Sequence, residues 1–129
     1  MYSKSVQTDT APAAVGPYSQ GIISGGLMFV SGQLGLDPQT GQLTGSDLAS
    51  QAARALENLG NILTAGGYVL TDVVAVDVYL TDMGGFTEFN TLYEGVFGSH
   101  KPARAVVEVS ALPKGACVEI KCIAHKPLH

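Results

Sequence analysis

Apolar residues recur at helical spacing in two stretches of this chain, and the segments around them have the patterns of strands. The first stretch follows Ser46, a suitable N-cap, and ends at Gly66-Gly67 after about five helical turns. The second runs through residues 86–97. The two apolar stripes consist of Leu48, Ala52, Ala55, Leu56, Leu59, Ile62 and Leu63, and of Phe86, Phe89, Leu92, Tyr93, Val96 and Phe97. The polar positions of the first helix, expected to face water, are Gln51, Arg54, Glu57, Asn58 and Asn61. Two helices cover one face of a sheet and leave the other open.

Strands are predicted from alternation and from turn residues. Segments 21–24 and 27–31 flank Gly25-Gly26, a two-residue hairpin signal. Further strands are predicted at 73–80, 102–109 and 117–125, with a short edge strand at 6–8. The core faces are expected to carry Val74, Val76, Val78 and Leu80, and Val118, Ile120, Cys122 and Ala124. We expect one α/β (α+β) domain over residues 1–129, with a mixed sheet of about five to six strands and both helices on one face.

Composition excludes several classes of protein. The chain has 129 residues, 46% of them hydrophobic, and a net charge of −4 without a lysine-arginine cluster, so we expect no nucleic-acid partner. No apolar run has the length of a membrane span, and the N-terminus lacks the apolar core of a secretory signal, so we expect a cytoplasmic protein and leave a mitochondrial location open. Cys117 and Cys122, and the histidines His100, His125 and His129, have no metal-ligand spacing, so no metal site is predicted.

The strand at 102–109 carries the first candidate site residue. Alternation places Arg104 on one face and Ala105, Val107 and Val109 on the other, which we expect to be the core face. If this strand pairs antiparallel with 117–125 through the loop at 111–116, then Glu119 shares the face of Arg104. An arginine fork at a strand end suits a planar carboxylate, and the plainer alternative is a surface ion pair.

The sheet face without helices is predicted to be too apolar for water and too charged for a dry core. Its expected members are Val73, Ala75, Asp77, Tyr79, Arg104, Val106, Glu108, Cys117, Glu119, Lys121 and Ile123. A second copy of the chain is the best candidate to cover it, with clefts near the subunit boundaries. The alternative is the solvated face of an ordinary antiparallel sheet.

Several short motifs, in order and with compatible spacing over nearly the whole chain, resemble the RidA/YjgF family of reactive-intermediate imine deaminases. They are Gly16-Pro17-Tyr18-Ser19-Gln20, Val30-Ser31-Gly32-Gln33, Pro102-Ala103-Arg104, Val107-Glu108-Val109, Leu112-Pro113-Lys114-Gly115 and Val118-Glu119-Ile120. The resemblance implies a chorismate-mutase-like fold. It also implies a homotrimer around a central β-barrel, with active sites between subunits.

The resemblance further implies an activity. Family members hydrolyse 2-imino acids such as 2-iminobutanoate and 2-iminopropanoate to 2-oxo acids and ammonia; these imines escape from pyridoxal-phosphate-dependent dehydratases. By position, Arg104 matches the arginine that binds the substrate carboxylate, and Glu119 matches the acid that orients or activates water. Tyr18 matches a position that lines the pocket, where either Tyr18 or backbone groups would orient the forming carbinolamine. Substrate-binding positions match Ser31, Gly32, Asn90 and Val106. The reaction requires no cofactor and no metal.

Individual positions also have plainer interpretations. Tyr18 is compatible with a half-buried aromatic, and Asn90 with a solvated helix residue. Many relatives carry cysteine where this chain has Val106, so a thiol role is absent and only a backbone contact is expected there. The alternative function is a non-catalytic module that binds small carboxylates such as 2-oxo acids. Ribonuclease activity is disfavoured by the negative charge and the lack of a suitable histidine pair, and chorismate mutase activity would rest on fold analogy alone.

Overall fold

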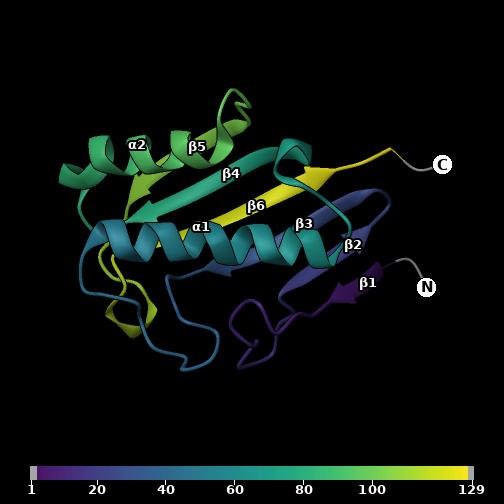
Figure 1. The fold of residues 1–129 in the computed structure, drawn as a ribbon, viewed down its shortest axis with the longest axis horizontal. Coiled ribbons are helices and arrows are strands. Elements are labelled where there is room, and N and C mark those ends of the chain that lie inside the picture. The colour runs from purple at the N-terminus through teal and green to yellow at the C-terminus, as the bar shows by residue number, and fades with distance from the viewer. Residues whose placement is uncertain (1–2, 128–129) are drawn as a thin grey trace.

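The computed structural model describes residues 3–127, which build one six-stranded sheet with two α-helices on one of its faces (Figure 1). The strands are β1 (Ser3–Val6), β2 (Gly21–Ser24), β3 (Leu27–Gln33), β4 (Val73–Leu80), β5 (Ala103–Glu108) and β6 (Val118–His125), and the helices are α1 (Leu48–Ala65) and α2 (Phe86–Phe97). The strand order is β1-β2-β3-β6-β4-β5. All neighbours are antiparallel except β4 and β5, which are parallel. The expected mixed sheet with two helices on one face is confirmed.

The hairpin between β2 and β3 forms as the glycine pair predicts. Gly25 and Gly26 have φ values of 59° and 86°, which a side chain would disfavour. The first strand lies three residues earlier than the predicted 6–8, because β1 pairs from Ser3 to Val6 with β2. Residues 7–20 then form the connection that leads into β2.

Helix α1 differs from the prediction in its cap and its polar face. Asp47, not Ser46, is the N-cap, and its carboxylate accepts a hydrogen bond of 3.1 Å from the backbone N–H of Ser50. Gln51 and Asn58 were predicted to face water but are 1% and 0% exposed. They are buried because their amides bind loop backbone that packs over the helix, which helical spacing alone does not reveal.

Strand β4 has an irregularity that changes which valines face the core. The register with β6 shifts between Val73 and Ala75, so that the side-chain alternation is interrupted there. As a result Val73 is fully buried, whereas Val74, predicted on the core face, is 46% exposed. From Val76 onward the predicted alternation holds.

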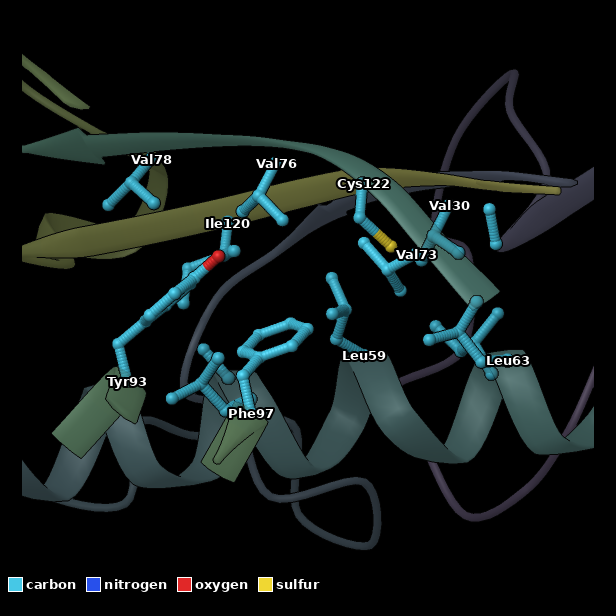
Figure 2. Packing of buried hydrophobic residues seen from close by; sticks show 14 of the residues in the cluster. Val30, Leu59, Leu63, Val73, Val76, Val78, Tyr93, Phe97, Ile120 and Cys122 are labelled. Atoms are coloured by element: carbon cyan, nitrogen blue, oxygen red, sulfur yellow. The ribbon is translucent and has the colours of Figure 1, made fainter. Parts of the chain in front are cut away.

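The core lies between this sheet and the two helices (Figure 2). Leu59 and Leu63 of α1 and Tyr93 and Phe97 of α2 point toward the sheet in the close view. Each fully buried side chain of this size contributes roughly 1.5–3 kcal/mol relative to an exposed one. The core face predicted for β6 is confirmed, with Val118, Ile120, Cys122 and Ala124 all buried.

The predicted pairing of the last two strands is wrong. β5 lies at the edge of the sheet and contacts only β4, whereas β6 lies between β3 and β4 (Figure 1). Because residues paired across a sheet share a face, Arg104 faces the helices with its buried partner Val76, and Glu119 faces away from them with Tyr79. Arg104 and Glu119 therefore lie on opposite faces of the sheet within one chain. The loop after β5 carries the chain past β4, and alternation within a strand contains no information about that path.

The same correction reverses the faces of β5. Val106, expected opposite the core, packs against it, whereas Ala105 and Val107, expected in the core, are exposed. The face of the sheet away from the helices is apolar in part, since Phe29 is 40%, Val74 46% and Val107 45% exposed. Among residues 3–127, no helix has the length and apolar character needed to span a membrane.

Candidate functional site

The predicted site residues lie in two separate pockets. The first, here the arginine pocket, is a hollow of about 500 Å³ between α2 and the segment that leads into β5. Its lining includes Asn90, Tyr93, His100, Lys101 and Arg104. The lining has three basic side chains, His100, Lys101 and Arg104, and one acidic side chain, Glu94, so its balance favours an anionic group.

Arg104 is held in place by residues of α2. Its Nη1 donates a hydrogen bond of 2.8 Å to Oδ1 of Asn90, and its Cζ lies 4.8 Å from the ring centroid of Tyr93 and 5.9 Å from that of Phe86. Asn90 therefore is not merely a solvated helix residue. The remaining N–H groups of the guanidinium are directed neither to Asn90 nor to a carboxylate of the described chain, so they are available to a ligand.

The second pocket, here the carboxyl pocket, has a volume of about 680 Å³. It lies where the end of β3 and the start of β6 meet three loops. Its lining includes Tyr18, Ser31, Gly32, Lys114 and Glu119. Four of the predicted site residues thus come together here, although the sequence separates them by about a hundred positions.

Glu119 is the ionisable group of the carboxyl pocket. Burial raises the pKa of its carboxyl, and the nearby charge of Lys121 opposes the increase only in part. Gly32 passes directly beside this carboxyl, and a Cβ at residue 32 would collide with the Glu119 Oε2. A side chain at this position would therefore have to displace the carboxyl of Glu119. The raised pKa makes this carboxylate a stronger base than an exposed glutamate.

Ser31 and Tyr18 have different freedom in this pocket. The Ser31 hydroxyl donates a 2.6 Å hydrogen bond to the carbonyl of Ser19, so toward a ligand it can only accept. The Tyr18 side chain is 53% exposed, and its backbone N–H closes a turn onto Gly16. Tyr18 thus has a hydroxyl available to a ligand, as its predicted role requires.

Gln20 lines this pocket, and sequence analysis predicted no individual role for it. It is 2% exposed, its Oε1 accepts 2.7 Å from the N–H of Thr8, and its Nε2 donates 2.7 Å to the carbonyl of Pro12. Its own carbonyl accepts from the N–H of Ser31. Gln20 therefore fixes the loop that forms one wall of the carboxyl pocket. The sequence contains one signal for this role, because Gln20 is the last residue of the motif Gly16-Pro17-Tyr18-Ser19-Gln20 on which the family resemblance rests.

Val106 and the cysteines contribute no reactive side chain to either pocket. Val106 packs against the core and lines neither hollow, which leaves only the backbone contact that was predicted for it. Cys122 is buried, and burial raises the pKa of its thiol to about 12. Cys117 places its Sγ 3.2 Å from Oε1 of Gln51, and burial raises its pKa as well. Both are free thiols.

The remaining titratable residues form no metal cluster within residues 3–127: no group of three histidine, cysteine or acidic side chains is close enough to bind an ion. His100 instead places Nε2 2.6 Å from the carbonyl of Val73. His129, considered with the other histidines from sequence, lies outside the described residues.

The structure thus divides the predicted site into two halves. Arg104 and Asn90 belong to the arginine pocket, and Tyr18, Ser31, Gly32 and Glu119 belong to the carboxyl pocket. The two linings share no residue. A ligand bound within one chain would therefore meet Arg104 or Glu119, but not both.

Comparison with known proteins identifies the family. The family model described as Endoribonuclease L-PSP matches residues 8–126. A RutC family protein of Pyrococcus horikoshii is 48% identical over 92% of this chain and 94% of its own, and the 2-iminobutanoate/2-iminopropanoate deaminase of Bos taurus is 47% identical over 94% and 88%. The crystal structure of RidA from an Antarctic Psychrobacter species superimposes with a TM-score of 0.92 at 44% identity, covering 95% of this chain and 99% of that one. With the fold and these matches in agreement, the chain belongs to the RidA/YjgF family.

Proposed function

We propose that this protein is a hydrolytic deaminase of small 2-imino acids, such as 2-iminobutanoate and 2-iminopropanoate, which it converts to 2-oxo acids and ammonia. The observation that carries the proposal is Glu119: a carboxyl group with a raised pKa, pressed against Gly32 in a pocket that also contains Tyr18 and Ser31. Relatives that carry the deaminase name, at 44–47% identity, support the same reaction.

The proposed active site combines the two pockets from neighbouring copies of the chain. Arg104 of one copy would bind the substrate carboxylate with two parallel hydrogen bonds, while Glu119 of the next copy faces the imine carbon. The apolar face around Phe29, Val74 and Val107 supports an assembly, because a copy placed there would remove these side chains from water. We propose the homotrimer of the family resemblance for this assembly, since a closed ring repeats one contact at every boundary.

The chemistry begins with the protonated imine as electrophile. A water molecule adds its oxygen to the C=N carbon, and the carboxylate of Glu119 accepts a proton from that water. The product is a carbinolamine, in which the carbon bears a hydroxyl and an amine. Tyr18 and the accepting oxygen of Ser31 would orient these groups.

Collapse of the carbinolamine uses the same proton. Protonated Glu119 gives it to the amine nitrogen, and the resulting carboxylate accepts the proton of the hydroxyl group as that oxygen forms the C=O bond and the C–N bond breaks. The 2-oxo acid and ammonia result, and ammonia takes the proton from Glu119 and leaves as ammonium, which restores the carboxylate. The raised pKa makes the carboxylate a stronger base for the first step, and the proton that it accepts there is the one delivered in the second.

The test generates 2-iminobutanoate with a threonine dehydratase, traps surviving imine with semicarbazide and adds this protein. We expect wild type to decrease the trapped imine, and Arg104→Ala to lower the rate by roughly a hundredfold, as expected for loss of a bidentate charged contact. Equal rates for wild type and Arg104→Ala would refute the assignment. If 2-oxobutanoate binds but imine is not consumed, the protein is a small-carboxylate binding module instead.

A further inference from the structure

We infer that Tyr93 is a positioning residue for Arg104, which fixes the guanidinium for a carboxylate through the face of its ring and not through its hydroxyl. The inference rests on the proposed function only in assuming that Arg104 binds a carboxylate. It assigns a role to a residue that helical spacing placed simply in the apolar stripe of α2.

The ring of Tyr93 is a rigid support. Along α2 it lies between Phe89, with ring centroids 5.7 Å apart, and Phe97, with ring centroids 4.6 Å apart and planes 30° from parallel. Tyr93 is 9% exposed. A ring packed between two others, and buried to this extent, cannot change rotamer without disturbing the core.

Arg104, by contrast, starts from an exposed strand at the edge of the sheet. A long side chain there would sample many rotamers, and ordering it when the ligand arrives would weaken binding. The Tyr93 ring, 4.8 Å from Cζ, removes part of that freedom beforehand by cation–π attraction, while Asn90 Oδ1 accepts from Nη1 and fixes the rotation of the fork. The Tyr93 ring thus restrains the plane of the guanidinium, and Asn90 restrains its rotation.

The hydroxyl has no part in this support. Tyr93 Oη is buried and has no hydrogen-bond partner among the described residues. In Figure 2 it points from α2 toward the sheet, on the side of Ile120. The features that matter at position 93 are therefore an aromatic face and its packing, both of which phenylalanine retains.

The experiment measures binding of 2-oxobutanoate, a stable product of the proposed reaction, by calorimetry to wild type, Tyr93→Phe, Tyr93→Leu and Arg104→Ala. Tyr93→Phe should bind as wild type, and Tyr93→Leu should bind about fivefold more weakly, the effect of losing one partly exposed cation–π contact. In the imine assay Tyr93→Leu should raise KM and leave kcat nearly unchanged, because Glu119 is untouched.

Leu63→Ala is the control for lost core packing. It truncates a buried side chain of α1 that lies outside the arginine pocket and outside the ring contacts of Tyr93, so it should lower the melting temperature at least as much as Tyr93→Leu without weakening binding. Equal weakening in Leu63→Ala and Tyr93→Leu, or unchanged binding in Tyr93→Leu while Arg104→Ala loses it, would overturn the role of Tyr93. If Arg104→Ala binds as tightly as wild type, the carboxylate role of Arg104 fails first, which is a failure of the proposed function.

Discussion

The two pockets hold their key side chains in opposite ways. In the arginine pocket the charge is exposed at a sheet edge, and aromatic packing with one amide hydrogen bond restrains it. In the carboxyl pocket Glu119 is partly withdrawn from water, and the backbone of Gly32 passes so close that a Cβ there would displace the Glu119 carboxyl. A permanent cation tolerates exposure because its protonation does not change, whereas the acid needs burial to raise its pKa.

The difference indicates how the work is divided. The arginine pocket can recognise an anionic ligand, but the Nε2 of its histidine, His100, is occupied by the carbonyl of Val73. The carboxyl pocket can exchange protons but has no comparable fork for a carboxylate. Each half is incomplete for imine hydrolysis, and their location in separate hollows of one chain favours a site completed by a second copy.

The largest effect is expected for the activity of mixed oligomers, in which one chain supplies an intact arginine pocket and its neighbour an intact carboxyl pocket. Arg104→Ala and Glu119→Gln should each be nearly inactive alone, yet co-refolded mixtures should recover about a quarter of wild-type activity. That fraction is roughly the share of sites with one intact half from each partner in random closed assemblies. The measurement is the imine assay after refolding an equal mixture. Arg104→Ala mixed with the double variant is the control and should stay inactive. No recovery in oligomers shown by mass spectrometry to be mixed would contradict a shared site.

The second prediction compares the activity lost on substituting Gly32, the glycine of the carboxyl pocket, with that lost on substituting a glycine elsewhere. Gly32→Ala should lower kcat/KM by at least roughly tenfold, because the new methyl group displaces the Glu119 carboxyl from its position. Gly60→Ala is the control, since a Cβ at that helical position meets nothing outside the helix. It should keep full activity and add up to about 1 kcal/mol of stability through helix propensity. Full activity in Gly32→Ala would show that the exact place of Glu119 is unimportant.

Sequence analysis predicts some of these features and misses others for identifiable reasons. Both helices and the Gly25-Gly26 hairpin are predicted from local sequence patterns, and the structure confirms them. The neighbours of β5 in the sheet cannot be predicted in this way, because strand pairing depends on the path of the connecting loops. Alternation correctly separates Glu119 from Val118, but it cannot place Arg104 relative to Glu119 without the intervening β4.

Side-chain roles are harder to predict than elements. Gln51 and Asn58 occupy polar positions of α1 that spacing assigns to water, although loop carbonyls make them part of the interior. The motif resemblance did identify Asn90 and Ser31, and each has a specific hydrogen bond in the structure. Their proposed contacts with substrate remain predictions.

A third prediction uses the pKa of Glu119 itself. Because burial raises it above that of an unfolded glutamate, ionisation of Glu119 destabilises the fold, and the penalty appears as pH rises through the folded pKa. Glu119→Gln should therefore melt higher than wild type at neutral pH. The difference should vanish below about pH 4, where both states of wild type are protonated.

The control is Glu57→Gln, which removes the exposed end of the 3.2 Å ion pair with Arg54 and should lower the melting temperature slightly, if at all. Melting temperatures of the three proteins across pH 3–8 (about the range that brackets glutamate titration) decide the question. A lower melting temperature for Glu119→Gln at neutral pH would show that its carboxylate is stabilised, contrary to the direction given by burial.

The smallest effect concerns the buried hydroxyl of Tyr93, a residue that lines the arginine pocket. A buried hydroxyl without a partner costs free energy that phenylalanine avoids, so Tyr93→Phe should raise the free energy of unfolding by about 1 kcal/mol. Burial also raises the pKa of Tyr93, with the charge of Arg104 opposing it, so wild type loses stability once pH exceeds about 10, where the unfolded chain ionises. The advantage of Tyr93→Phe in urea denaturation should therefore increase above that pH. A variant less stable than wild type at neutral pH would mean that the hydroxyl has a partner in the assembled protein, and the arginine pocket would then have a second polar support.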